Sequence, residues 1–142
     1  MLISKASAVW EGGLKDGNGR YEAGTGSFSG AYTFASRFTD EVGTNPEELI
    51  AAAHAACLSM ALSAGLERAG TPPERISTTA TATLEKVEAG FRLTKMHLEV
   101  RGVVPNMDAA AFASAAEAAK DGCPVSNALK GNVAFTLAAK LE

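Results

Sequence analysis

The chain has 142 residues, with 13 Lys and Arg against 16 Asp and Glu, so its net charge is −3. This length predicts one domain over residues 1–142, and the slightly acidic balance argues against a nucleic-acid-binding protein, which needs a basic surface. Its two cysteines are too few for a disulfide-stapled secreted scaffold.

The N-terminal residues 1–10 are too polar, and their apolar runs too short, for a signal peptide. We therefore expect a cytoplasmic protein whose two cysteines are free thiols in a reducing compartment. Any disulfide between them would then be transient and catalytic.

The first forty residues have the pattern of β-structure. Apolar and polar side chains alternate over residues 6–10 and again over residues 32–38, which is typical of half-buried strands. Glycine-rich turns at residues 12–13 and 16–19 interrupt the pattern. The sequence predicts three strands here, the last one reaching Arg37 and Phe38.

A long helix is predicted next. Asn45 suits the N-cap, Pro46 suits the first helical position, and Glu48 stands where a capping box needs an acid. The helix is expected to end near Ala69, because one glycine and two prolines follow within residues 70–73.

This helix is apolar on nearly every side. Its segment 50–66 reaches the lower limit of membrane-spanning length, but eight of the 17 residues are Ala or Gly, which favours a buried core helix over a membrane span. A helix that is apolar all round must be surrounded by other elements. We expect part of it to pack against a second copy of itself in a homodimer, with no membrane as partner.

The second half of the chain returns to strands. Residues 76–87 and 91–104 predict two long strands joined by a hairpin, and a change of apolar phase near Lys95 predicts a β-bulge. A helix capped by Asp108 follows and is expected to end at Gly122. A helical turn over residues 123–129 and a last strand over residues 131–141 complete an α+β order, βββ-α-ββ-α-β.

The two cysteines are the first candidates for chemistry. A reactive thiolate needs nearby positive charge or a helix N-terminus, and Cys123, directly before Pro124, stands at such a terminus. Cys57 lies about three turns into the long helix, so a cation would have to reach it from elsewhere. From the residues alone, either cysteine could instead be a small core hydrophobe.

The two histidines have weaker claims. His54 lies three positions before Cys57 on one helix face and could act as its base, but a buried, hydrogen-bonded histidine is the favoured interpretation. His97 is expected to be structural or at the surface. A metal site built from His54, Cys57 and Cys123 lacks ligand spacing and a fourth partner, so no metal is expected.

Four segments together carry a family pattern: residues 8–12 (AVWEG), Arg37-Phe38, residues 43–57 (GTNPEELIAAAHAAC) and residues 123–129 (CPVSNAL). The pattern resembles the OsmC branch of the OsmC/Ohr family of bacterial osmotically inducible and organic-hydroperoxide-resistance proteins, over nearly the whole chain. The resemblance implies an α+β fold with antiparallel sheets packed around a long central apolar helix. It also implies an intertwined homodimer with two active sites at the subunit interface.

The resemblance further implies a peroxidase without a cofactor, which uses thiol reductants to reduce organic hydroperoxides, and hydrogen peroxide less well. It suggests a lipoyl-type dithiol as the reductant. Cys57 matches the family's peroxidatic cysteine and Cys123 its resolving cysteine. Arg37 matches the arginine near the reactive thiol, with Arg20 as a weaker rival, and Glu47 matches the active-site glutamate. A thiol–disulfide oxidoreductase or a non-catalytic stress-induced dimer remains as the alternative.

The spacing of two of these residues is a constraint. Glu47 and Cys57 are ten positions apart on one predicted helix, which corresponds to roughly 15 Å along its axis. One Arg37 side chain cannot easily contact both within a single chain. We therefore expect the glutamate of one subunit to serve the cysteine of the other.

Overall fold

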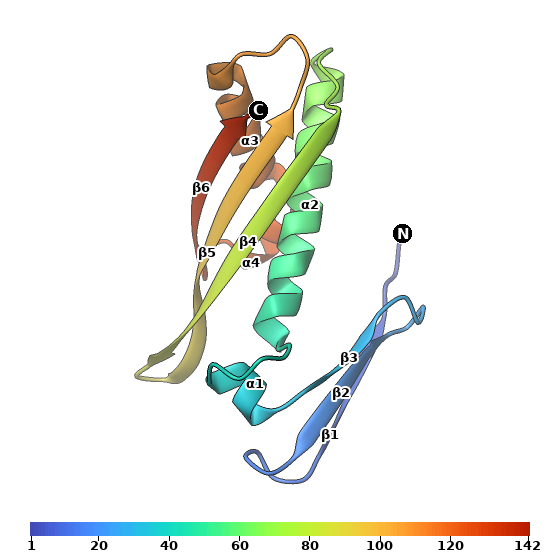
Figure 1. The fold of residues 1–142 in the computed structure, drawn as a ribbon, viewed down its shortest axis with the longest axis vertical. Helices are drawn as coiled ribbons and strands as arrows, with labels where there is room; N and C mark the ends of the chain where they lie inside the picture. The colour runs from blue at the N-terminus through green and yellow to red at the C-terminus, as the bar shows by residue number, and fades with distance from the viewer. The chain divides into compact units, whose positions relative to one another are not determined.

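Six strands and four helices follow one another along the chain in the computed structural model, which describes residues 1–142 (Figure 1). They group into two units, residues 1–49 and residues 50–142. The α+β order expected from the sequence is confirmed, with one additional helix near residue 35.

The first unit contains a three-stranded antiparallel meander in the order β1-β2-β3. Its aromatic rings pack on one another, since the ring centroids of Trp10 and Tyr32 lie 5.5 Å apart and those of Tyr21 and Tyr32 lie 6.0 Å apart. The strands are β1 (Ala6–Glu11), β2 (Asn18–Ala23) and β3 (Ser29–Tyr32).

The segment after β3 differs from the sequence prediction. Residues 34–38 form the short helix α1 (Phe34–Phe38) rather than a continuation of the strand. The Ser36 N–H donates to Thr33 Oγ1 at 3.1 Å, and the Thr33 N–H donates to Ser36 Oγ at 2.9 Å. This reciprocal capping box offers the backbone a helical alternative that the apolar alternation does not reveal.

The long helix α2 (Pro46–Arg68) begins where the sequence predicts it. Asn45 Oδ1 accepts the Glu48 N–H at 2.8 Å, which confirms Asn45 as the N-cap. The other elements of the second unit are β4 (Arg75–Val87), β5 (Gly90–Val103), α3 (Ala109–Gly122), α4 (Pro124–Leu129) and β6 (Ala134–Leu141).

The β4–β5 hairpin contains the predicted bulge. Thr83 pairs with Lys95, whereas the next residue, Leu84, pairs with Leu93, so Thr94 is left as the extra residue. The insertion turns Leu93 and Met96 to one face of the sheet, which explains the change of apolar phase in the sequence.

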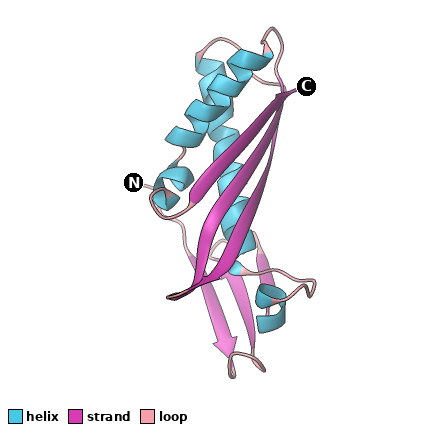
Figure 2. Cartoon of the chain, turned by 90° about the vertical axis from the view of Figure 1, so that its left-hand side faces the viewer, coloured by secondary structure: helices cyan, strands magenta, loops and turns pink.

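The last strand corrects the expectation of purely antiparallel sheets. β6 pairs with β5 in parallel, in a sheet of order β4-β5-β6. The physical reason is the connection: α3 and α4 carry the chain back along the sheet, and a parallel neighbour requires a crossover of this kind. In Figure 2 the helices of this unit lie on one side of the three-stranded sheet.

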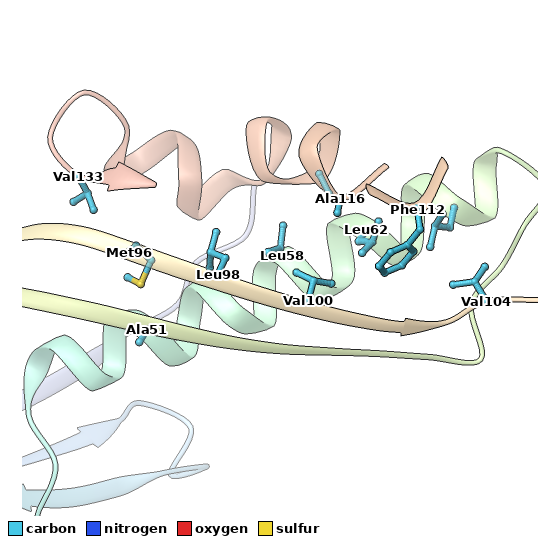
Figure 3. Packing of buried hydrophobic residues seen from close by; sticks show 12 residues of the cluster. Ala51, Leu58, Leu62, Met96, Leu98, Val100, Val104, Phe112, Ala116 and Val133 are labelled. Carbon is cyan, nitrogen blue, oxygen red and sulfur yellow. The ribbon is translucent and has the colours of Figure 1, made fainter. Parts of the chain in front are cut away.

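The core of the second unit lies between this sheet and the helices α2 and α3, which pack on its same face (Figure 3). Alternate residues of β5 point into it, as the period of a strand requires. Every third or fourth residue of α2 does so as well. The buried members include Leu58, Leu62 and Leu66 of α2, Met96, Leu98 and Val100 of β5, and Phe112 and Ala116 of α3.

Only one face of α2 is buried within the chain. By length and composition α2 could cross a membrane, with a mean hydropathy of 1.8, but core helices pass the same test. Leu58 and Leu62 are inaccessible to solvent, whereas Met60 on another face is 76% exposed. Packing of this remaining apolar surface against a second copy stays a prediction.

Gly102 is required by the packing of Phe112. A Cβ atom at Gly102 would lie 2.4 Å from the Phe112 ring, which is fully buried. We expect Gly102→Ala to lower the free energy of unfolding by about 1–3 kcal/mol, because the overpacked ring has no free space to enter. Urea denaturation followed by circular dichroism measures this. Gly13→Ala, where no atom lies within 4 Å of the added carbon, is the control, and equal losses in both variants would contradict the argument.

Candidate active site

Cys57 lies on α2, one position before the buried Leu58, and is a half-buried free thiol. Burial raises the pKa of the Cys57 thiol, and a hydrogen bond from the Val125 N–H lowers it in part. The side chain of Cys123 raises this pKa further, through a hydrogen bond and through its charge. Cys57 therefore lies against the first turn of α4.

Cys123 is the N-cap of α4 and is fully buried. The Ser126 N–H donates to its Sγ at 3.4 Å, and the Cys123 thiol donates to Ser126 Oγ at 3.3 Å. Burial opposes ionisation of Cys123, but its hydrogen bonds with the Ser126 and Cys57 side chains and those from the Ser126 and Val125 N–H groups outweigh burial and lower the pKa of Cys123.

The two sulfurs thus form one interacting pair, each influencing the ionisation of the other. Within the second unit, Cys123 is the more acidic thiol and Cys57 the more accessible one. The expected helix-terminus effect at Cys123 is present. The same α4 N-terminus also reaches Cys57, which the sequence could not show, because residues 57 and 125 are far apart in the chain.

A second group of side chains adjoins the thiols. His54 is fully buried, and its Nε2 lies 2.7 Å from Ser126 Oγ, so the imidazole and Cys123 Sγ contact the same hydroxyl. His54 Nδ1 has no hydrogen-bond partner. Its ring stands edge-on to Phe135 at 5.3 Å, and burial lowers the pKa of His54. The favoured interpretation of a buried, hydrogen-bonded histidine is confirmed. Ser126 was missed as a site residue, although its place in the CPVS segment is a usable signal.

Arg37 and Glu47 form an ion pair in the first unit. Arg37 Nη2 lies 2.7 Å from Glu47 Oε1, and Arg37 Nε donates to both carboxylate oxygens at 3.2 and 3.3 Å. The pair is a two-point contact of guanidinium and carboxylate, the geometry that holds an arginine head group most rigidly. Glu47 is buried, while Arg37 keeps about a third of its side chain exposed, so the cation is fixed yet open to a ligand.

The remaining candidates are not part of either cluster. Arg20 is exposed on β2, and Arg37 rather than Arg20 pairs with Glu47. His97 on β5 binds Thr136 Oγ1 through its Nδ1 at 2.6 Å, in keeping with a structural role. No group of three or more His, Cys, Asp or Glu side chains is arranged to hold a metal ion.

A family model for OsmC-like proteins matches residues 38–138. The chain belongs to the OsmC family. The match includes Cys57 and Cys123 and contains the sequence segments 43–57 and 123–129, whereas residues 8–12 and Arg37 lie before it.

This OsmC-family chain is similar in sequence and structure to several named proteins. Peroxiredoxin OsmC of Escherichia coli is 48% identical over 133 residues, which are 93% of each protein. An organic hydroperoxide resistance protein of Xanthomonas axonopodis pv. citri is 36% identical over 97 residues, 67% of this chain and 66% of that protein. Among solved structures, the organic hydroperoxide resistance protein OhrB of Bacillus subtilis is similar with a TM-score of 0.75 at 26% identity, covering 97% of this chain and 98% of that one. The predicted OsmC/Ohr-like fold is confirmed.

Proposed function

We propose that this protein is a cysteine-based peroxidase that reduces organic hydroperoxides to alcohols, and hydrogen peroxide less well. The observation that carries the proposal is the interacting pair of free thiols, Cys57 accessible and Cys123 buried. A peroxidase role is supported by the names of the relatives, a peroxiredoxin and a hydroperoxide resistance protein.

The chemistry follows from the order of accessibility. The Cys57 thiolate attacks the O–O bond of the hydroperoxide, an alcohol leaves, and Cys57 becomes a sulfenic acid. Cys123 then attacks the Cys57 sulfur, which gives a disulfide and water. An external dithiol of lipoyl type reduces this disulfide by thiol–disulfide exchange and returns both thiols.

Arg37 supplies the charge that the thiol pair lacks. Burial raises the pKa of Cys57, so attack at neutral pH needs a cation that favours the thiolate. Arg37, held by Glu47, has free guanidinium surface for the thiolate and a peroxide oxygen.

We propose that this cation acts across a dimer. Glu47 and Cys57 are ten residues apart on α2, about 15 Å of helix rise, and Arg37 is bound to Glu47. The Arg37–Glu47 pair of one subunit therefore serves Cys57 of the other in a homodimer with two active sites. The exposed apolar faces of α2 support a dimer, because such a surface is costly to leave in water.

Reaction of the reduced protein with one equivalent of cumene hydroperoxide tests the peroxidase. We expect two thiols to be lost per chain in the native protein and none in Cys57→Ser, since the attacking sulfur is then missing. Cys123→Ser should lose one thiol and form a sulfenic acid that dimedone traps. Thiol counting and mass spectrometry measure these outcomes. A native protein that keeps both thiols is not a peroxidase. If its thiols react with protein disulfides but not with the hydroperoxide, the protein is a thiol–disulfide oxidoreductase instead.

If Arg37 of one subunit serves Cys57 of the other, two inactive variants should restore activity when they are mixed in one dimer. Arg37→Ala should keep the fold and lower the rate of cumene hydroperoxide reduction about 100-fold or more, because a preorganised charge is lost, whereas Arg20→Ala should be nearly unchanged. Refolding Arg37→Ala together with Cys57→Ser creates mixed dimers with one complete site. We expect about a quarter of the native activity to return, given that half the dimers are mixed. Activity no higher than the sum of the separate variants would place Arg37 beside Cys57 of its own chain.

The dimer itself is tested at α2. The native protein should sediment as a dimer at micromolar concentration, and Met60→Glu should shift it toward the monomer, since a charge on this apolar surface must be desolvated on association. Ala134→Glu is the control, because Ala134 is an exposed residue of β6 that pairs with Lys95. A native monomer, or equal effects of both variants, would argue against α2 as the interface.

A further inference from the structure

A continuous chain of hydrogen bonds leads from the buried thiol to a buried imidazole, and the peroxidase steps above do not use it. Cys123 Sγ lies 3.3 Å from Ser126 Oγ, and Ser126 Oγ lies 2.7 Å from His54 Nε2. All three residues are at most 2% exposed. The chain joins α2 to α4, over a separation of 72 residues between His54 and Ser126.

The proton positions in this chain follow from its donors and acceptors. Burial lowers the pKa of His54, so the imidazole is neutral at pH 7 and one of its nitrogens holds a free lone pair. The Cys123 thiol donates to Ser126 Oγ, which leaves the Ser126 O–H free to donate to Nε2. His54 Nδ1 then carries the ring hydrogen, without a partner. Each hydrogen bond is therefore donated in the same direction, from the thiol toward the imidazole.

We propose that Ser126 and His54 form a relay that removes the thiol proton of Cys123 when this residue attacks an oxidised Cys57. Ser126 contacts the reacting sulfur, and His54 is a positioning residue and proton acceptor behind it. The inference rests on the proposed peroxidase function, whose second step it explains.

The step balances without a further reagent. Cys123 forms an S–S bond with Cys57 while the S–O bond of the Cys57 sulfenic acid breaks. The Cys57 sulfur is reduced and the Cys123 sulfur is oxidised. The Cys123 proton passes to Ser126 Oγ as the Ser126 proton passes to His54 Nε2. As the S–O bond breaks, His54 gives a proton back through Ser126 to the departing hydroxide, which leaves as water, so no proton is gained or lost. When a dithiol reduces the disulfide, the protons of the two regenerated thiols come from the dithiol.

A relay is needed because Cys123 is buried. Solvent does not reach Cys123, so water cannot accept its proton directly. The His54 ring hydrogen-bonds Ser126 of α4 and lies edge-on to Phe135 of β6, and neither side chain is charged. Cys123 and Cys57 are therefore the titratable groups at the other end of the chain. A charged imidazole in this pocket is costly, so His54 holds the proton only while Cys123 is a thiolate.

The Cys123 step can be isolated with dithiobis(nitrobenzoate). The Cys57 thiolate releases a first thionitrobenzoate and becomes a mixed disulfide, and attack by Cys123 releases a second. Stopped-flow absorbance resolves the two phases. At pH 7 we expect His54→Gln and Ser126→Ala to slow the second phase roughly 100-fold, a typical loss for a missing base, and to leave the first phase within about twofold. Gln can still hydrogen-bond Ser126 but cannot take a proton.

His97→Gln is the matched control, because His97 also binds a hydroxyl, that of Thr136, but in an exposed pair on β5 and β6 that includes neither cysteine. It should leave both phases unchanged. Raising the pH to about 9, above the ordinary thiol pKa, should bring His54→Gln close to the native rate, since the Cys123 thiolate is then populated at equilibrium without the relay. An unchanged second phase at pH 7, a deficit that is equal at both pH values, or a native protein without a second phase would overturn the relay.

Comparing the reaction with dithiobis(nitrobenzoate) and the reaction with cumene hydroperoxide separates this inference from the proposed function. A protein that shows both phases but does not consume cumene hydroperoxide is no peroxidase, and the relay is then decided by the effect of the variants on the second phase. Conversely, if the protein consumes hydroperoxide but His54→Gln leaves the second phase unchanged, the proposed function is retained and the relay is wrong.

Discussion

The hydrogen bond between His54 and Ser126 fastens together the two segments that bring the thiols into contact. It spans 2.7 Å between α2 and α4, and α4 belongs to the crossover that joins β5 to β6. Both side chains are buried, so breaking the bond would leave polar atoms unsatisfied in the interior, at a cost of about 1–3 kcal/mol each. Because Cys57 lies one turn beyond His54, and Cys123 caps the helix that carries Ser126, this single contact sets the register of the pair.

The sequence predicted the fold well where local signals are strong. Asn45 and Asp108 both cap the helices expected of them, and the phase change near Lys95 located the bulge at Thr94. Two features were not predictable from period alone. The capping box between Thr33 and Ser36 replaced a strand by a helix. The parallel pairing of β6 depends on the path of α3 and α4 through space, which no local pattern records.

The site was predictable in its members but not in its electrostatics. Local helix physics identified Cys123 as the acidic thiol, and the structure lowers its pKa as expected. It could not show that the Val125 N–H also reaches Cys57, or that Ser126 connects Cys123 to His54. These contacts join residues about seventy positions apart. The division is physical: helix dipoles and caps act within a few residues, whereas burial and hydrogen bonding depend on tertiary packing.

The parallel strand at the end of the chain has a consequence for biosynthesis. Synthesis proceeds from the N-terminus, so Cys57 leaves the ribosome well before Cys123, and the edge of the sheet that supports α4 is completed only by β6, the last element of the chain. During that interval Cys57 has no Cys123 thiol beside it. A sulfenic acid formed then has no intramolecular exit and is open to oxidation to the sulfinic state. Under the proposed mechanism, a finished chain has a resolving thiol beside Cys57, and a chain still in synthesis does not.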